Sequence, residues 1–543
     1  MLAGTVPWPE VQARRYRAAG WWDGSTVFDV LARAAAARPA HAALVDGARR
    51  LSYAELQHDA QRLAARLLAL GIAPLDRVVV QLPNVAEFVV VYFALARIGA
   101  IPVMALRAHR QAELRHFLLA SGAVAYIVPD RIGSFDYRPM AQALCAQAPA
   151  LRHVIVLGEA LDGQLGYAAL MGRDDVAEPA VWPAVDPGEV ATMLLSGGTT
   201  SLSKLIPRTH QDYVLNARLC AAAAGFDERT VLMAILPLGH NYNLASPGLL
   251  GTFWHAGTVV LAPSGEAQAV FELVERERVS VIAAVLPLVV NWLASNAESG
   301  RDLASLKVIQ NGGARLAPEL RLRLRERYGC VPQEIYGTAE GLINMTRLDD
   351  PDPLLLHSSG TPVCPDDELR VVDDHGFEVP DGEPGELLTR GPYTIRGYYD
   401  APEKNAEAFA PDGWYRMGDI VRKQGRHVYA EGRKKDLINR GGEKISCEEV
   451  ENLIFGHPKV QAVTLVAMPD PVFGEKACAF VIPRPGQTLR FDELIAFLRA
   501  QDIAAFKLPE RLEIVSEFPL SPVGKILKRS LREQLVGSGS GSG

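Results

Sequence analysis

The sequence contains few cysteines and no segment suited to crossing a membrane. Six cysteines occur among 543 residues, and they form neither a CxxC pair nor a Cys/His cluster with zinc-ligand spacing. Such sparse use is typical of a reducing compartment, so we expect a cytoplasmic protein with buried thiols. Residues 1–15 lack a signal-peptide pattern, and the most apolar stretch, 88–96, is far too short to span a bilayer.

The sequence also lacks a strongly basic balance and an internal repeat. Its formal net charge is -7, with 48% hydrophobic and 22% charged residues, which is an ordinary globular composition. No positive field favours nucleic acid as a partner. A chain of this length predicts about two to four domains.

The N-terminal part alternates apolar runs with amphipathic helical patterns. Residues 51–71 and 86–99 read as helices, the first ending at a glycine, and 76–84 reads as a short buried strand. Further β-rich runs, bounded by Pro, Gly or Asp, are 101–106, 125–130, 153–158 and 258–263. This alternation predicts an α/β fold in which helices flank mainly parallel sheets.

The pattern changes after about residue 360. Segment 367–391 carries close-set turn signals, which predict antiparallel strands or a small β-barrel. A compact α+β pattern follows the charged segment 431–444, so we place a domain boundary at 433–435. The expected domains are 1–432 and 433–536, followed by a flexible Gly/Ser linker at 537–543. An ordinary surface loop at 433–435 is the alternative.

Segment 194–210, LLSGGTTSLSKLIPRTH, has the chemistry of a phosphate-binding loop. Its glycines let backbone N–H groups approach an anion, and its hydroxyls and lysine add donors. It is not a Walker A loop, because the Gly-Lys-Ser/Thr ending is missing. Taken alone, it also fits a plain loop.

Three single residues carry weaker signals. Glu340 follows a glycine turn and offers the hard oxygen ligands that Mg²⁺ prefers. Asp419 offers two acceptor oxygens for ribose hydroxyls, and Lys525 follows a Pro/Gly turn near the C-terminus. Taken alone, Glu340 and Lys525 also fit solvated surface charges.

The order of these signals resembles the acyl-adenylate-forming superfamily of acyl-CoA synthetases, luciferases and nonribosomal adenylation domains. The resemblance covers residues 20–536 and is closest to the stand-alone aryl-acid AMP ligases of siderophore biosynthesis. It rests on the words SGGTTSLSKLIPRTH, HNYNLASPG, AEGLINMTRLDDP, LLTRGPYTIRGYY, INRGGEKI and PVGK. It implies a large N-terminal domain and a small mobile C-terminal domain that rotates over it.

The resemblance also implies a set of ATP- and Mg²⁺-binding residues. Lys525 would reach both the substrate carboxylate and the ATP α-phosphate, Glu340 would bind Mg²⁺, and Tyr336 would stack on adenine. Asp419 and Arg433 would hold the ribose. The remaining implied nucleotide contacts are the phosphate-loop residues Ser196, Gly197, Gly198, Thr199, Thr200 and Lys204, and the adenine-side residues Gly312, Gly313, Ala314 and Gly337.

The implied acid pocket centres on segment 238–248. Asn241 would bond a 2-hydroxyl and Ser246 would lie near ring position 3, which favours 2,3-dihydroxybenzoate. Ile343, where a smaller valine is usual, shifts the expectation toward salicylate or a heteroaryl acid such as 3-hydroxypicolinate. Core packing is the alternative role for Ser246 and Ile343. The full implied pocket is His240, Asn241, Tyr242, Ser246, Ala314, Ala339 and Ile343.

A second half-reaction is implied by the same resemblance. The C-terminal domain would turn about a hinge at Lys435 and admit the phosphopantetheine arm of a separate aryl carrier protein. Because the sequence ends soon after Lys525, we expect the carrier domain to belong to a separate protein. An aryl-CoA ligase, a luciferase-type oxidation and a non-catalytic nucleotide-binding scaffold are the alternatives, and both a monomer and a homodimer remain open.

Overall fold

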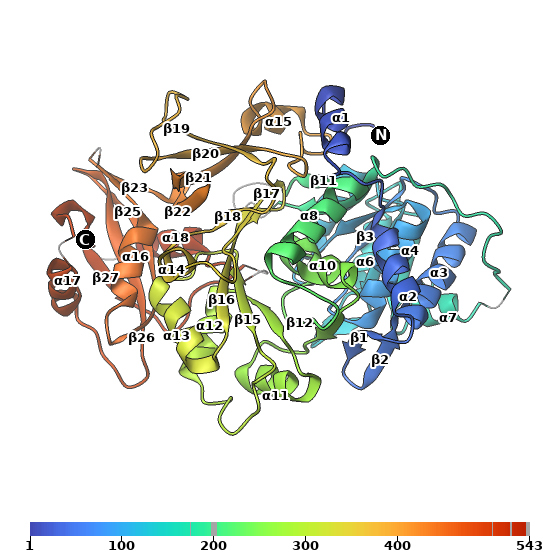
Figure 1. The fold of residues 1–543 in the computed structure, drawn as a ribbon, viewed down its shortest axis with the longest axis horizontal. Coiled ribbons are helices and arrows are strands. Elements are labelled where there is room, and N and C mark those ends of the chain that lie inside the picture. Colours follow the sequence, from blue (N-terminus) through green and yellow to red (C-terminus); the bar gives the residue numbers. More distant parts are fainter. Residues whose placement is uncertain (174, 197–202, 442, 502, 522–523, 539–543) are drawn as a thin grey trace.

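A computed structural model describes residues 1–173, 175–196, 203–441, 443–501, 503–521 and 524–538. Two large β-sheets form its centre, and the C-terminal elements form a separate group beside them (Figure 1). Among the residues described, none of the helices combines the length and the apolar character that a membrane span requires. The α/β class expected from the sequence is confirmed.

The first sheet has seven strands. Its order is β11 (Leu205–Thr209), β10 (Val190–Leu195), β4 (Ile101–Met104), β3 (Arg77–Val80), β5 (Ala125–Pro129), β8 (His153–Leu157) and β9 (Leu165–Gly166). All its neighbours run parallel except β10 and β11, which form an antiparallel pair. The glycine-rich loop of the sequence lies between β10 and β11 along the chain, and its described end residues Ser196 and Lys204 adjoin these two strands.

The second sheet has nine strands. Its order is β18 (Thr361–Pro362), β17 (Gly341–Met345), β16 (Val331–Thr338), β15 (Val308–Gly312), β14 (Val281–Ala284), β12 (Val231–Ala234), β13 (Thr258–Leu261), β1 (Ala42–Asp46) and β2 (Arg49–Ser52). The strands from β1 to β16 are parallel, and antiparallel strands lie at both edges.

Helices fill the space between the two sheets and cover their outer faces. One continuous core joins residues of both sheets to α2 (Val27–Ala37), α3 (Tyr53–Ala69), α4 (Ala86–Ile98), α8 (His210–Ala223) and α10 (Gly248–Trp254). On the outer face of the nine-stranded sheet lie α11 (Ala267–Glu277), α12 (Leu286–Ala294) and α13 (Pro318–Tyr328). On that of the seven-stranded sheet lie α5 (Gln111–Ser121) and α6 (Arg138–Cys145).

Local sequence explains where the predicted helix at 51–71 begins and ends. The Ser52 hydroxyl accepts a hydrogen bond from the Glu55 N–H while the Glu55 carboxylate accepts one from the Ser52 N–H, which is a capping box. The helix α3 ends at Ala69, and Gly71 follows with a φ of 78°. That left-handed backbone favours glycine, which has no Cβ to clash there.

The region after residue 360 forms an antiparallel sheet and then a small α+β domain. The sheet order is β19 (Glu368–Val372), β20 (Pro384–Arg390), β21 (Tyr415–Gln424) and β22 (His427–Arg433). A 3-10 turn, η1 (Lys434–Asp436), contains the backbone of the predicted hinge residue Lys435 and leads into the C-terminal domain.

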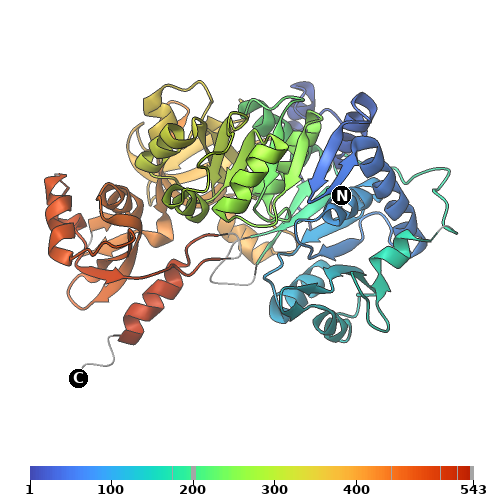
Figure 2. The ribbon, with the colours of Figure 1, turned by 90° about the horizontal axis from the view of Figure 1, so that it is seen from below.

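The C-terminal domain is built on strands β23–β27 and helices α16–α18. These are β23 (Ile438–Arg440), β24 (Glu443–Ile445), α16 (Cys447–Phe455), β25 (Val460–Asp470), β26 (Gly474–Pro483), α17 (Phe491–Ala500), η2 (Ala505–Lys507), β27 (Arg511–Ile514) and α18 (Lys528–Ser538). Figure 2 shows these orange and red residues as a group beside the larger body. Helix α18 includes the first two residues of the segment expected to be a linker.

The remaining elements are short. They are α1 (Glu10–Ala18), β6 (Arg131–Ile132), β7 (Phe135–Asp136), α7 (Tyr167–Met171), α9 (Asn241–Ala245), α14 (Asp352–His357) and α15 (Pro402–Ala408). Of these, α9 carries the predicted acid-pocket residues Asn241 and Tyr242 and contacts both α8 and α10.

Candidate active site

The two ends of the glycine-rich loop are hydrogen-bonded to each other. The Ser196 N–H donates to the Lys204 carbonyl at 3.0 Å, and the Lys204 N–H donates to Ser196 Oγ at 2.9 Å. The predicted phosphate contacts Gly197, Gly198, Thr199 and Thr200 lie outside the described residues. Lys204 Nζ lies 4.2 Å from the ring centroid of Tyr398, so the lysine's charge is directed toward that tyrosine.

Tyr398 also contacts Glu340, the predicted Mg²⁺ ligand. Its hydroxyl donates to Glu340 Oε1 at 3.0 Å, and the Glu340 carbonyl accepts from the Ile395 N–H at 2.7 Å. Glu340 is buried in the connection between β16 and β17. Tyr398 therefore joins Lys204 at the phosphate loop to the carboxylate at the next sheet.

A Mg²⁺ ion fits this carboxylate only together with further oxygens. Within the described ranges, no group of three or more His, Cys, Asp or Glu side chains is arranged to hold a metal. Mg²⁺ is commonly bound by one or two carboxylates plus substrate phosphates, so a single buried Glu340 near the predicted phosphate loop suits it.

A chain of polar contacts joins Tyr336, Asp419 and Arg433. The Tyr336 hydroxyl donates to Asp419 Oδ2 at 2.8 Å, and Arg433 Nε lies 2.8 Å from Asp419 Oδ1. Burial raises the pKa of Asp419, and the positive charge of Arg433 opposes that rise. The three predicted adenine and ribose contacts are thus one connected group at the end of β22, where the C-terminal domain begins.

Gly312 and Gly313 each lie close to a residue of the predicted site, and at Gly312 a side chain would be obstructed. A Cβ on Gly312 would lie 2.9 Å from Tyr242 Cε1, and one on Gly313 would lie 3.4 Å from Lys525 Cε. Gly313 also has a φ of 83°, a backbone conformation that favours glycine. The structure therefore brings Lys525 of the C-terminal domain against the predicted adenine-side wall of the N-terminal domain.

Other residues of that wall are fixed by their surroundings. The Ala314 carbonyl accepts a hydrogen bond from Asn311 Nδ2 at 2.8 Å. A Cβ on Gly337 would lie 2.2 Å from the Leu342 carbonyl oxygen, so this strand position has no room for a side chain.

The charge of Lys525 reaches two other site residues. Burial lowers the pKa of His240 to about 4, and Lys525 contributes to that shift. Lys525 also lowers the pKa of Asp419, against the larger effect of burial. His240 caps helix α9, where its Nδ1 accepts from the Tyr242 N–H at 3.3 Å. Lys525 thus lies between the predicted ribose and acid sites.

The predicted acid-pocket residues form a buried polar cluster beside apolar walls. Asn241 Nδ2 donates to Ser246 Oγ at 3.2 Å, and both side chains are buried. Tyr242 packs on Gly312, and Ile343 is buried on β17. Ala339 is partly buried and packs against the core between the two sheets.

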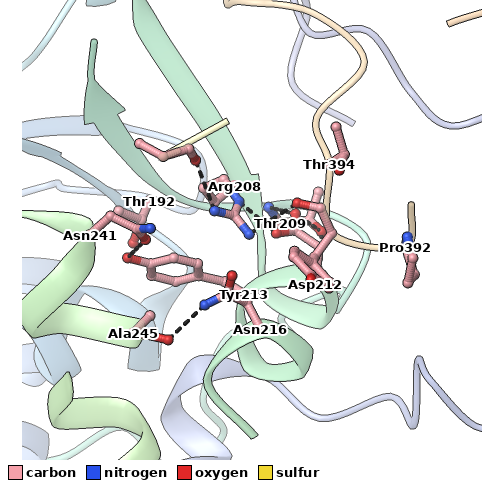
Figure 3. A network of polar contacts seen from close by, with 12 residues as sticks. Thr192, Arg208, Thr209, Asp212, Tyr213, Asn216, Asn241, Ala245, Pro392 and Thr394 are labelled. Atoms are coloured by element: carbon pink, nitrogen blue, oxygen red, sulfur yellow. Dashed lines mark hydrogen bonds and ion pairs between the residues drawn. The ribbon is translucent and has the colours of Figure 1, made fainter. Parts of the chain in front are cut away.

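Sequence reasoning missed several residues that position this site. Arg208, fully buried on β11, donates to the Ala339 carbonyl at 2.9 Å and pairs with Asp212 at 2.7 Å (Figure 3). Tyr213 and Asn216 on α8 contact Asn241 and Ser246. The sequence could have indicated Tyr213 and Asn216, because polar residues three positions apart lie on one face of a helix.

This arrangement brings the side chain of Lys525, from the small C-terminal domain, to the predicted site on the larger body. Two family models match the chain. The "AMP-binding enzyme" family matches residues 31–399, and the "AMP-binding enzyme C-terminal domain" matches residues 449–525. The chain therefore belongs to the AMP-binding enzyme family and is a ligase.

Individual relatives cover nearly the full chain. The chain is 47% identical to a 2,3-dihydroxybenzoate-AMP ligase of Bacillus subtilis (strain 168), covering 98% of each. It is 44% identical to a salicyl-AMP ligase / salicyl-S-ArCP synthetase of Mycobacterium tuberculosis (strain ATCC 25618 / H37Rv), covering 98% of this chain and 95% of the relative.

A solved structure shows the same fold. The crystal structure of the anthranilate CoA ligase AuaEII in complex with anthranoyl-AMP has a TM-score of 0.88 and 25% identity, covering 95% of this chain and 98% of that one. The resemblance to the acyl-adenylate-forming superfamily and to aryl-acid AMP ligases, stated from the sequence, is confirmed. The roles of individual site residues stay predictions.

Proposed function

We propose that this enzyme uses ATP to convert an aryl carboxylic acid into its acyl-AMP and pyrophosphate. The observation that carries the proposal is the position of Lys525, against Gly313 and between His240 and Asp419. A carboxylate oxygen attacks the α-phosphorus, and the bond from that phosphorus to the departing pyrophosphate breaks. The ammonium of Lys525 lowers the repulsion between the two anions and stabilises the charge that develops between them.

The chain's other residues hold the nucleotide. Asp419 and Arg433 hold the ribose, Tyr336 and the Gly312–Gly313 wall enclose adenine, and the 196–204 loop binds phosphates. Glu340 would hold Mg²⁺, which supplies positive charge to the departing pyrophosphate when it is bound.

For the acid, 2,3-dihydroxybenzoate is the substrate that Asn241 and Ser246 support best. Their amide and hydroxyl are buried side by side and hydrogen-bonded to each other, a spacing that suits two oxygens on neighbouring ring positions. The 2,3-dihydroxybenzoate-AMP ligase relative supports this acid, and the salicyl-AMP ligase relative supports salicylate as the second candidate. A heteroaryl acid such as 3-hydroxypicolinate is a further candidate.

The acceptor of the acyl group would be a phosphopantetheine thiol on a separate aryl carrier protein, as part of siderophore assembly. In that step the thiol sulfur attacks the acyl carbon, AMP leaves, and the thiol proton passes to solvent. The relative named as a salicyl-S-ArCP synthetase supports this acceptor, and the CoA ligase neighbour makes coenzyme A the alternative.

ATP–pyrophosphate exchange tests the proposal directly. The acids compared are 2,3-dihydroxybenzoate, salicylate, benzoate, anthranilate and 3-hydroxypicolinate, and we expect the highest kcat/KM for the first. Loading of a carrier domain against coenzyme A then identifies the acceptor. Absence of exchange with every acid would contradict an aryl-acid ligase and favour a nucleotide-binding scaffold.

A further inference from the structure

The amide of Asn216 has one fixed orientation. Its Nδ2 donates to the Ala245 carbonyl at 2.6 Å and to Ser246 Oγ at 3.2 Å, and Figure 3 shows it pointing at Ala245. A backbone carbonyl only accepts, so the nitrogen must face it and the opposite orientation would oppose two oxygens. Asn216 is fully buried on α8. Ser246 Oγ therefore always accepts a hydrogen bond from this amide.

Tyr213 fixes the second amide of the cluster, that of Asn241. The Tyr213 hydroxyl lies 3.0 Å from Asn241 Oδ1, and the phenol points at Asn241 in Figure 3. Tyr213 is fully buried, so reversing the Asn241 amide would leave the phenol hydrogen without an acceptor. An unmet buried donor costs about 1–3 kcal/mol, so the observed orientation is strongly favoured.

These two orientations leave two hydrogens of Ser246 and Asn241 that are not used within the cluster. Ser246 Oγ accepts from Asn216 and from Asn241, so its own hydrogen is left to donate. Asn241 Nδ2 uses one hydrogen on Ser246 and retains the other. Within the described part of the chain, neither remaining hydrogen has a hydrogen-bond acceptor among the contacts of these two side chains.

We propose that Tyr213 and Asn216 are positioning residues that make Asn241 and Ser246 a pair of hydrogen-bond donors, which selects aryl acids with oxygen at ring positions 2 and 3. This inference rests on the proposed function. A 2-hydroxyl beside a carboxylate gives its hydrogen to that carboxylate, so its oxygen accepts from Asn241. The 3-oxygen accepts from Ser246, and the 3-hydroxyl hydrogen turns to the 2-oxygen.

The same donor pair disfavours a 2-amino group. The nitrogen lone pair of anthranilate is delocalised into the ring and is a poor acceptor, so the Asn241 hydrogen would meet another donor. A site that leaves such groups unpaired can reject an analogue strongly. We therefore expect the wild-type enzyme to prefer 2,3-dihydroxybenzoate over anthranilate by at least about 100-fold in kcat/KM.

The test compares Tyr213→Phe with a matched control, Tyr92→Phe. Tyr92 is also fully buried, and its hydroxyl bonds Thr192 Oγ1 at 3.1 Å instead of a pocket residue. Pyrophosphate exchange is measured with 2,3-dihydroxybenzoate, salicylate, anthranilate and benzoate. In Tyr213→Phe we expect kcat/KM for 2,3-dihydroxybenzoate to fall about 10-fold, mainly through KM, with benzoate within about twofold. Tyr92→Phe should leave the ratios between acids unchanged.

A second variant tests the donor role itself. Asn241→Asp keeps an acceptor for Tyr213 but removes the N–H donor, so the preference for a 2-hydroxyl over a 2-amino group should fall by about 10-fold or more. Unchanged ratios in both pocket variants, or an equal loss with benzoate in Tyr213→Phe, would overturn the inference while the ligase activity stands. Wild-type enzyme inactive with every acid would instead reject the proposed function.

Discussion

Lys525 contributes both its alkyl chain and its charge to the predicted site. Its Cε lies within van der Waals reach of any Cβ at Gly313, and its charge acts on His240 and Asp419 from the same place. An ammonium in water is strongly screened, whereas one packed against a glycine wall acts on its neighbours through a lower dielectric. Its removal should therefore affect the reaction far more than the fold.

Replacing this lysine is the most direct test of its role. Lys525→Ala should lower the rate of pyrophosphate exchange by about 10²–10³ while the thermal unfolding midpoint stays close to wild type. Arg529→Ala is the control, because Arg529 lies four residues further on and pairs with Glu533 on the exposed face of α18. Exchange at the wild-type rate in Lys525→Ala would refute the assignment.

His210 makes the stability of the fold depend on pH. Burial lowers its pKa from 6.5 to about 4, and its Nδ1 accepts from the Val27 N–H at 3.1 Å. Between pH 6.5 and 4 the unfolded chain therefore binds a proton that the folded chain does not. The stabilisation is present above pH 6.5 and is lost as the pH falls toward 4.

The variant His210→Gln keeps an acceptor for Val27 and removes this titration. Between pH 7 and pH 4.5 the free energy of unfolding of the wild type should fall by about 2 kcal/mol more than that of the variant. Urea denaturation at intervals of half a pH unit measures both curves. Burial raises the pKa of Asp367 to about 7, so its titration changes stability in the opposite direction. Such groups are the same in both proteins, so their effects cancel when the two stability curves are subtracted. Parallel curves would contradict a neutral buried His210.

On the scale of elements, β11 and α8 join the predicted phosphate loop to the predicted metal and acid sites. Strand β11 begins directly after Lys204 and ends at Thr209, whose hydroxyl caps α8. Arg208 donates from β11 to the carbonyls of Ala339 and Tyr393, and Asp212 on α8 neutralises it. One strand and one helix thus support residues of the predicted phosphate, metal and acid sites.

Breaking this pair should destabilise the whole N-terminal domain. Arg208→Met leaves the Asp212 carboxylate buried without its cation, which should lower the free energy of unfolding by about 3–5 kcal/mol. The matched control is Arg229→Ala, where the arginine pairs with Asp227 at 2.6 Å but is 84% exposed, and the change should stay below about 1 kcal/mol. Denaturant titration of both variants measures the contrast, and equal losses would contradict it.

The elements also show what sequence could and could not predict. Helix α3 was readable because its cap, its apolar period and its glycine end are all local. The contact of Tyr213 with Asn241 was not, since the two residues are 28 apart and meet only because α9 folds back on α8. Likewise β1 lies beside β13, an arrangement that short apolar runs leave undetermined.

On the scale of the whole molecule, the proposed reaction would require the two domains in a defined arrangement. The Ser446 hydroxyl donates to the Glu431 carbonyl at 2.6 Å, and Arg315 faces Glu448 at 3.6 Å across the same boundary. The connection between the domains is the short turn Lys434–Asp436. A change in that turn should alter the proposed rotation of the C-terminal domain while leaving the residues of the predicted ATP and acid sites unchanged.

Lys435→Pro tests this expectation. Proline restricts the backbone of the turn, so pyrophosphate exchange should stay within about twofold of wild type while loading of the carrier thiol slows by about 10-fold or more. Exchange and loading are measured on the same preparation, and each serves as the control for the other. Equal losses in both assays would count against a hinge at this residue.

The contact of Lys525 with Gly313 has a consequence for timing. In the proposed mechanism, the cation of Lys525 and the nucleotide wall at Gly313 belong to segments 212 positions apart in the chain, so each catalytic cycle would include an encounter between the two domains. A molecule or mutation that holds the C-terminal domain away from the N-terminal domain would abolish activity even when ATP and the acid are both bound. The turnover rate would then depend on how often the C-terminal domain returns to the N-terminal domain.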